Sequence, residues 1–373
     1  MPVQPAPLIT LTLSVMLAIM IGWLLMIGKS LLIPIMIAVM SVYVIATSSR
    51  AMARWPVTRH LPEFLRKILL GLAFIAILAA LNWVVIVTAR DLVALGPAYQ
   101  ANIERMIAQG FGLVGLEENP DWESIAEVVF GRINMPAFIS GLAGSVGSMV
   151  GVLVLAVVYA VFLAAEATGF AHKLAVALPD RMQAMRTQGM IEAINARIGD
   201  YLAVKTLINV IVGLLSWVVL WAFGVDHALF WALMIGILNY IPYFGSLVAV
   251  AFPVLMATVQ FGSITMALGV GVSLTAVNMW VGNWLEPRMI GGRVNMSPFV
   301  VVAALSFWTT LWGVAGAILA VPMTSTLAII LASFSQTRPF AVLLANDVSE
   351  FERPADHPDA RPVDLPAGPP GIG

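Results

Sequence analysis

Long apolar runs, separated by short polar segments, fill most of this 373-residue sequence. A helix needs about 20 mostly apolar residues to cross the hydrocarbon core of a bilayer. Runs of about that length occupy five positions: 8–27, 31–49, 68–89, 141–165 and 202–223. The pattern therefore predicts an all-α polytopic membrane protein.

Two further apolar segments, 229–259 and 298–334, are too long for one span and too short for two spans with a turn. Pro242 interrupts the first segment, and four residues interrupt the second: Thr309, Thr310, Gly313 and Gly316. Backbone that leaves the helix inside a bilayer must be buried in protein or line a watery cavity. We therefore predict two broken, re-entrant helical hairpins, with one more full span at 264–284 between them. The total is about six full spans and about eight hydrophobic segments.

Charged residues predict the orientation in the membrane. Lysine and arginine are concentrated in the segments 50–67 and 168–200, whereas 90–139 is acidic. Basic residues mark the cytoplasmic loops of membrane proteins. We therefore expect both termini and both basic segments in the cytoplasm, and the acidic segment on the opposite side.

Composition divides the chain into five regions. Ile191, Ile194 and Ile198 recur at helical spacing, which predicts an amphipathic helix leading into the span at 202–223. Beyond residue 336 the chain is polar and rich in proline, so it cannot bury a core. The predicted regions are the first three spans (1–89), an acidic extracytoplasmic segment (90–139), the fourth span with cytoplasmic amphipathic helices (140–200), a transport unit with the broken hairpins (201–336) and a disordered proline-rich cytoplasmic tail (337–373).

The composition also excludes several classes of protein. Charged residues make up only 10% of the chain, against about 25% in a soluble domain. The net charge of −1 gives no sign of a nucleic-acid partner. The sequence has no cysteine, no P-loop motif and no aspartate inside a predicted span, and its four histidines lie in predicted loops or the tail. Neither ATP hydrolysis nor intramembrane proteolysis can be built from such a set, so we predict no enzymatic activity, no cofactor and no metal.

Uncharged polar residues and backbone-breaking residues gather at the two breaks and in the span between them. For any one of these residues, a hydrogen bond between helices is the more common role. For the whole set a polar binding site is the better explanation, and the scarcity of charge favours a small neutral hydrophilic solute. The candidate substrate-binding residues are Asn239, Tyr240, Pro242, Tyr243, Gly245, Ser246, Asn278, Asn283, Thr309 and Thr310.

Three charged residues near the predicted transport unit are candidates for coupling or gating: Lys205, Glu286 and Arg288. Charges close to a membrane are costly and often functional. Each also has a simpler explanation. Lys205 can extend its amine toward the interface from the first turn of a span, and Glu286 and Arg288 can form a local ion pair around Pro287.

Several motifs of the second half resemble one known family. They are YLAVKT at 201–206, LNYIPYFGS at 238–246, GNWLEPRMIG at 282–291 and the segment 297–324, which holds SPF, FW and AVPMT. Together they resemble the autoinducer-2 exporter (PerM-like permease) family, densely over 201–346 and only in layout before that. One departure is Tyr243-Phe244, where many relatives carry Asn-Ile.

The resemblance implies a multi-pass protein of the bacterial inner (cytoplasmic) membrane that exports autoinducer-2 or a related small solute. It also implies an elevator-type carrier, in which a hairpin domain moves against an oligomeric scaffold. The expected partners are a small-molecule solute, membrane lipid and further copies of the chain. Some members of the family are associated with sodium/proton antiport instead.

Three hypotheses follow. The first is a secondary carrier whose two hairpin tips meet near the middle of the membrane and bind the solute. The second is a sodium(cation)/proton antiporter, for which Glu286 and Lys205 are the only plausible titratable residues. The third is a non-transporting membrane scaffold that acts through 90–139, and the polar breaks at Pro242 and Thr309 argue against it.

Overall fold

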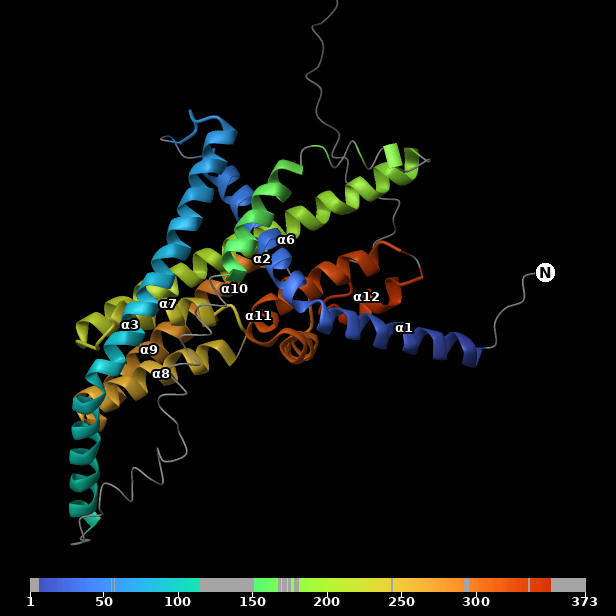
Figure 1. Cartoon of the computed structure of the whole chain (residues 1–373). Helices are drawn as coiled ribbons and strands as arrows, with labels where there is room; N and C mark the ends of the chain where they lie inside the picture. Colours follow the sequence, from blue (N-terminus) through green and yellow to red (C-terminus); the bar gives the residue numbers. More distant parts are fainter. Residues whose placement is uncertain are drawn as a thin grey trace, which may run out of the picture.

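The computed structural model shows a bundle of long helices (Figure 1). It describes residues 7–54, 56, 58–114, 151–166, 169, 173, 176–177, 181–242, 244–291, 295–334 and 336–349. Within these ranges the regular structure is helical and contains no strand. Six of the described helices are long and apolar enough to cross a membrane. The predicted all-α polytopic class is therefore confirmed.

The N-terminal part consists of three consecutive helices, α1 (Pro7–Ile27), α2 (Lys29–Met52) and α3 (Glu63–Val114). The first two match the spans predicted at 8–27 and 31–49. The third continues well past residue 89, where we expected the span to end, because polar residues end a membrane-embedded stretch without ending a helix. The first part of the segment predicted as extracytoplasmic is thus a continuation of α3.

The described part of the predicted fourth span is the apolar helix Gly151–Glu166, while residues 141–150 lie outside the described residues. The helix α6 (Arg181–Ala222) follows and crosses much of the molecule in Figure 1. It joins the predicted amphipathic helix and the predicted span into one element. The expected division between 200 and 201 therefore falls inside a continuous helix.

The first hairpin consists of α7 (Ala228–Leu238) and α8 (Phe244–Phe261), which pack against each other. The break between them includes residues 239–242, as the sequence predicts. Gly245 is required at the turn because a Cβ atom there would lie 1.9 Å from the carbonyl oxygen of Leu238.

A single apolar segment follows the first hairpin: α9 (Ile264–Trp280), the π-helical turn η1 (Val281–Leu285) and α10 (Glu286–Ile290). The wide turn has a cause in the sequence. Pro287 has no backbone N–H to donate to the carbonyl of Asn283, and its ring collides with that carbonyl in a regular α-helix. One π-helical turn relieves the conflict, and such turns are frequent at functional sites.

The second hairpin is α11 (Pro298–Ala332), which bends sharply at Gly313. Gly313 has φ 62° and ψ −141°, a conformation that is essentially restricted to glycine. The indole N–H of Trp308 donates to Thr324 Oγ1 at 3.0 Å. These residues would be about 24 Å apart along a straight helix, so the contact demonstrates that the two arms fold back on each other.

Part of the region predicted as a tail is helical. Residues 338–344 form a short helix, α12 (Arg338–Leu344), which packs against α11 and buries Ala341. The Asn295 side chain holds the following residues: its Nδ2 donates to the carbonyl of Asp347, and its Oδ1 accepts from the backbone N–H groups of Asn346 and Asp347. The apolar face of α12 therefore overrides the polar composition, while residues 350–373 lie outside the described residues.

Three apolar clusters organise the described helices, and α6 contributes to two of them. Its N-terminal half, with Ile198 and Leu202, packs against Val300 and Val321 of the second hairpin. Its C-terminal half packs against α7, α8 and α9 in a cluster that contains Ile208, Val212, Leu220, Ala232, Ile235, Ala257, Val270 and Leu274. The junction between the two clusters falls near residue 205 of α6.

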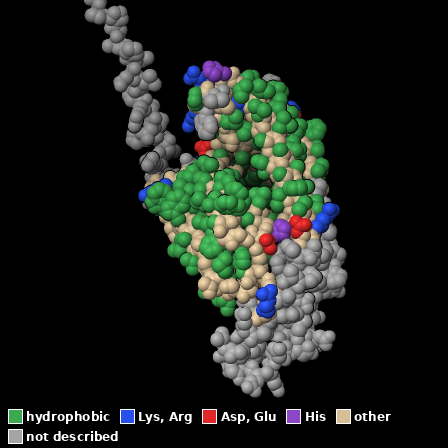
Figure 2. All heavy atoms as spheres, turned by 90° about the vertical axis from the view of Figure 1, so that its left-hand side faces the viewer, with side chains coloured by type: hydrophobic (Ala, Val, Ile, Leu, Met, Phe, Trp, Pro, Cys, Tyr) green, Lys and Arg blue, Asp and Glu red, His purple; other side chains and the backbone are tan. Residues whose placement is uncertain are grey.

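The outer surface is apolar over a wide area. Large hydrophobic side chains are exposed along α1, α3, α8 and α9. Figure 2 shows one such face, where hydrophobic side chains predominate and charged side chains lie near the margins. This distribution is the reverse of that on the surface of a soluble protein, and it fits helices that are surrounded by lipid.

Candidate functional site

The strongest electrostatic feature of the described residues is a largely buried ion pair between two distant parts of the chain. Lys205 Nζ on α6 lies 2.5 Å from Glu286 Oε1 at the start of α10. Lys205 is only 5% exposed, whereas the Glu286 side chain is partly accessible. Removing two charges from water is expensive unless they are paired closely. The amine therefore points into the protein rather than toward the membrane surface.

Two hydrogen-bonded pairs continue the polar site along α6 toward the first break. Thr206 Oγ1 and Tyr240 OH are 2.7 Å apart. Asn239 Nδ2 donates to Asn209 Oδ1 at 2.9 Å. Residues 205 and 209 are one helical turn apart, so they share a face of α6. We name the six residues Lys205, Thr206, Asn209, Asn239, Tyr240 and Glu286 the polar cluster.

Close packing of α6 and α7 brings the break to this face. Gly236 on α7 lies against the backbone of Asn209, where an added Cβ atom would be 3.1 Å from the Asn209 carbonyl oxygen. Gly213 makes a similar approach to the carbonyl of Ala232. Small residues allow helix backbones to approach closely in membranes, and Asn239 and Tyr240 then follow directly after the last turn of α7.

The structure thus brings Lys205, Asn239, Tyr240 and Glu286 together from the candidates identified in the sequence. It adds Thr206 and Asn209, which the sequence analysis missed. A signal for them existed, since both are polar residues in an otherwise apolar span, within four residues of Lys205. Their spacing of one and four residues from Lys205 along a helix would have identified them as neighbours of its side chain.

The other uncharged candidates lie apart from the polar cluster or bond within their own helix. Asn278 Nδ2 donates to Leu274 O, and the hydroxyls of Thr309 and Thr310 donate to the carbonyls four residues before them. Asn283 is exposed on η1. Of the remaining candidates at the first break, Tyr243 lies outside the described residues, while Pro242, Gly245 and Ser246 belong to the turn into α8.

The second hairpin packs against the N-terminal helices instead of against the first hairpin. Trp308 and Trp312 belong to a cluster with residues of α1 and α2. The indole N–H of Trp312 donates to the carbonyl of Leu25 at 2.9 Å. In this conformation the expected meeting of the two tips is therefore replaced by a contact with α1 and α2, because the tryptophans make that surface apolar.

Arg288 does not form the local ion pair with Glu286 that the sequence suggested. Its guanidinium lies over the ring of Trp284, 3.8 Å from the ring centroid, and Trp284 in turn stacks on Trp280. Glu286 bonds to Lys205 on α6 instead. Arg288 is therefore held by a cation–π contact on the exposed side of the same helix.

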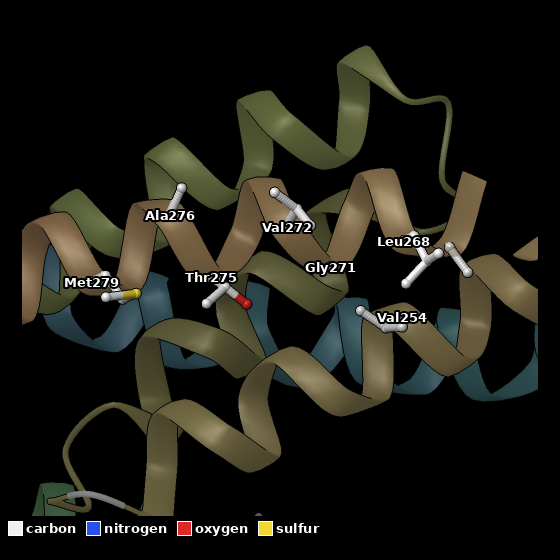
Figure 3. A pocket seen from close by; sticks show the side chains of 8 residues that line it. Val254, Leu268, Gly271, Val272, Thr275, Ala276 and Met279 are labelled. Carbon is white, nitrogen blue, oxygen red and sulfur yellow. The ribbon is translucent and has the colours of Figure 1, made fainter. Parts of the chain in front are cut away.

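A hollow on the outer surface of α8 and α9 has a different character. Its volume is about 420 Å³, and Val254, Leu268, Val272 and Met279 line it with apolar atoms (Figure 3). Thr275 supplies the only side-chain hydroxyl in this lining. It suits a lipid chain better than a polar solute. Among the described residues, moreover, no group of three histidine or acidic side chains is placed to hold a metal ion.

Comparisons with known proteins agree with a transport role for such a structure. The AI-2 transport protein TqsA of Escherichia coli strain K12 is 28% identical over 351 residues, 91% of this chain and 98% of the relative. A candidate transport protein of Haemophilus influenzae is 28% identical over 87% of this chain and 92% of its own length. The candidate transport protein YhhT of Escherichia coli K12 is 34% identical over 56% of this chain and 57% of its own length.

The family model matches a longer part of this chain than most of the single relatives do. Residues 13–336 match the family described as AI-2E family transporter, which includes both hairpins and the polar cluster. This range covers nearly the whole chain. It includes the first half, where the sequence motifs resembled the family only in layout. The chain belongs to the AI-2E transporter family.

Proposed function

We propose that this transporter is a secondary carrier for a small, polar, neutral solute, which binds at the polar cluster beside the first hairpin. The observation that supports this most strongly is a group of buried or half-buried, uncharged hydrogen-bonding side chains next to a close ion pair. Intramembrane polar groups are expensive and usually mark a pathway for substrate or ions. Broken helices in transporters commonly form such sites.

The charge balance favours a neutral cargo. Lys205 and Glu286 cancel each other at 2.5 Å, and the other members of the polar cluster carry no charge at neutral pH. A charged solute would therefore meet no unmatched countercharge among these six side chains. Autoinducer-2 is the candidate cargo, because the relative TqsA is named as an AI-2 transport protein.

An elevator-like movement is the mechanism that we propose for crossing the membrane. The helices α7, α8 and α9 share an apolar cluster with the C-terminal half of α6. The second hairpin packs against α1, α2 and the N-terminal half of α6. Apolar clusters on either side of the polar cluster are the arrangement that a moving unit and a supporting unit would use.

A cation/proton antiporter is the second candidate function, and the Lys205–Glu286 pair is the observation that favours it. A partly buried carboxylate that exchanges a lysine partner for a proton could couple ion movement to a conformational change. This requires the pair to open during transport. A scaffold without transport activity is the third candidate, although half-buried polar groups at a helix break offer nothing to such a role.

Transport assays with purified protein in liposomes separate these functions. We expect wild-type protein to exchange labelled autoinducer-2 and to show no sodium-driven proton movement. Sodium-dependent proton flux that Glu286→Gln abolishes would favour the antiporter. Absence of both activities from correctly inserted, folded protein would contradict the proposed function and leave the scaffold.

A further inference from the structure

We propose that Asn102 of α3 is a positioning residue of the transport cycle, which holds the first hairpin in this conformation and must release it before the hairpin moves. This inference rests on the proposed elevator-like function. Asn102 Nδ2 donates to the backbone carbonyl of Gln260, near the end of α8, at 2.6 Å. The two residues are 158 positions apart in the sequence. We name the hydrogen bond between them the latch.

The latch joins the two units that the proposed movement separates. The helix α3 follows α2 and packs against it, and α2 shares apolar clusters with the second hairpin. The same helix α3 also contacts α7 and α8 (Figure 1). Because Gln260 belongs to the first hairpin, a movement of this hairpin along α3 has to break the latch.

The acceptor in the latch is a carbonyl group that its own helix does not satisfy. The helix α8 ends at Phe261, and the last four carbonyl groups of an α-helix lack partners within the helix. The backbone N–H of Gly262, just beyond the end, donates to the carbonyl of Thr258 at 3.0 Å. Asn102 supplies the donor for the carbonyl of Gln260, so α3 caps the C-terminal end of α8.

Further hydrogen bonds fix both sides of the latch. The guanidinium of Arg105 donates to Asn102 Oδ1 at 2.5 Å, which leaves the amide N–H groups of Asn102 for Gln260. The side chain of Gln260 bonds to the turn between α6 and α7: Nε2 donates to the carbonyl of Gly224, and Oε1 accepts from the backbone N–H of Asp226, both at 2.8 Å. The latch therefore holds the ends of α6, α7 and α8 together.

The latch lies at the end of the hairpin that is remote from the polar cluster. The helix α8 begins next to the first break and ends at the latch, 18 residues or about 27 Å away. Asn102 therefore acts on the position of the hairpin through Gln260, and not on cargo at the polar cluster.

Spin labels on α3 and α8 measure the position of the hairpin directly. The natural chain has no cysteine, so Trp83→Cys and Leu255→Cys, both at exposed positions, provide two specific labelling sites. Double electron–electron resonance in lipid nanodiscs, without cargo, measures the proportion of each hairpin position. Asn102→Asp keeps the size of the side chain but removes its donor at neutral pH. We expect it to raise the ratio of released to latched protein about fivefold, as for the loss of one hydrogen bond.

A second variant and a control show whether the bond has only a structural role. Asn102→Ala should give the same increase as Asn102→Asp. Asn295→Ala is the matched control: it removes an amide that bonds to the carbonyl of Asp347, away from the first hairpin, and should leave the ratio unchanged. An unchanged ratio in both Asn102 variants, with or without a lower melting temperature, would overturn the inference. A single distance in the wild type and in both variants would overturn it together with the elevator-like movement.

Counterflow of labelled autoinducer-2 in proteoliposomes separates this inference from the proposed cargo. The expected change of ratio, in a protein whose wild type does not carry autoinducer-2, would reject the candidate cargo and support the latch. Wild-type counterflow together with an unchanged ratio in the Asn102 variants would retain the proposed function and overturn the latch.

Discussion

At the scale of single residues, the Lys205–Glu286 pair determines how the polar cluster responds to change. Both charges lose much of their contact with water, and only their proximity compensates. A buried pair of this kind adds little net stability compared with apolar residues of similar volume, but a single remaining charge is strongly unfavourable. Replacing one member of the pair should therefore destabilise the fold, whereas replacing both members with apolar residues should have little effect on stability.

The first prediction follows from this asymmetry. Lys205→Met should lower the free energy of unfolding by about 3 kcal/mol, because Glu286 is left without its partner. The double variant Lys205→Met/Glu286→Leu should recover most of this loss. Chemical or thermal unfolding of the purified protein measures both effects. Equal stability of the single variant and the wild type would show that the ion pair does not form in the membrane protein.

At the scale of elements, each hairpin places a glycine in close contact with the backbone carbonyl of an earlier residue in the same hairpin. Gly245 faces the carbonyl of Leu238 in the first hairpin, and Gly316 faces the carbonyl of Trp308 in the second. In each case a Cβ atom would lie 1.9 Å from that oxygen. The chain reverses sharply only because these positions have no side chain.

The second prediction concerns these two glycines. Gly245→Ala and Gly316→Ala should each lower the free energy of unfolding by about 3 kcal/mol, because backbone must move to admit the methyl group. Gly71→Ala on α3 is the control: an added Cβ atom there meets nothing within 4 Å, so stability should be unchanged or slightly higher. Similar melting temperatures for all three variants would refute the tight turns.

The third prediction concerns the short helix α12. Asn295 holds residues 346 and 347 through three hydrogen bonds. Asn295→Ala should loosen this connection, so limited proteolysis should cut within 338–349 several times faster than in the wild type. Cleavage of the remaining chain should not change. An unaltered rate at this segment would mean that packing against α11 alone holds α12.

The sequence could predict the breaks at Pro242 and near Gly313, since residues that disrupt helices are conspicuous in apolar runs. It could also single out Lys205, Asn239, Tyr240 and Glu286, which the structure brings together. It could not pair Lys205 with Glu286, because 81 residues separate them and the contact depends on how α6 packs. The sequence could not predict which helices the second hairpin packs against either, because tertiary contacts of Trp308 and Trp312 determine this packing.

At the scale of the whole molecule, α6 connects two apolar clusters, and the polar cluster lies at their junction. The orientation of this arrangement in the membrane rests on the distribution of charge: basic between α2 and α3, and acidic after residue 90. A mobile first hairpin and a fixed second hairpin would then expose the polar cluster to opposite sides in turn.

The fourth prediction tests the orientation. The natural chain has no cysteine, so single cysteines can be introduced without removing others. In intact cells a membrane-impermeant maleimide should label Arg105→Cys, an exposed position in the C-terminal part of α3, and should not label Arg54→Cys after α2. Both variants should react after the membrane is opened. The opposite pattern in intact cells would invert the orientation.

The central claim is that the cargo passes through the polar cluster at the first break, and one measurement tests it most directly. Counterflow of labelled autoinducer-2 should fall about tenfold in Asn239→Leu, which removes the amide that bonds to Asn209. Thr258→Val in the same hairpin is the control, because its hydroxyl donates to the carbonyl of Val254 on its own helix, and its counterflow should match the wild type. Wild-type counterflow in folded Asn239→Leu would contradict the claim.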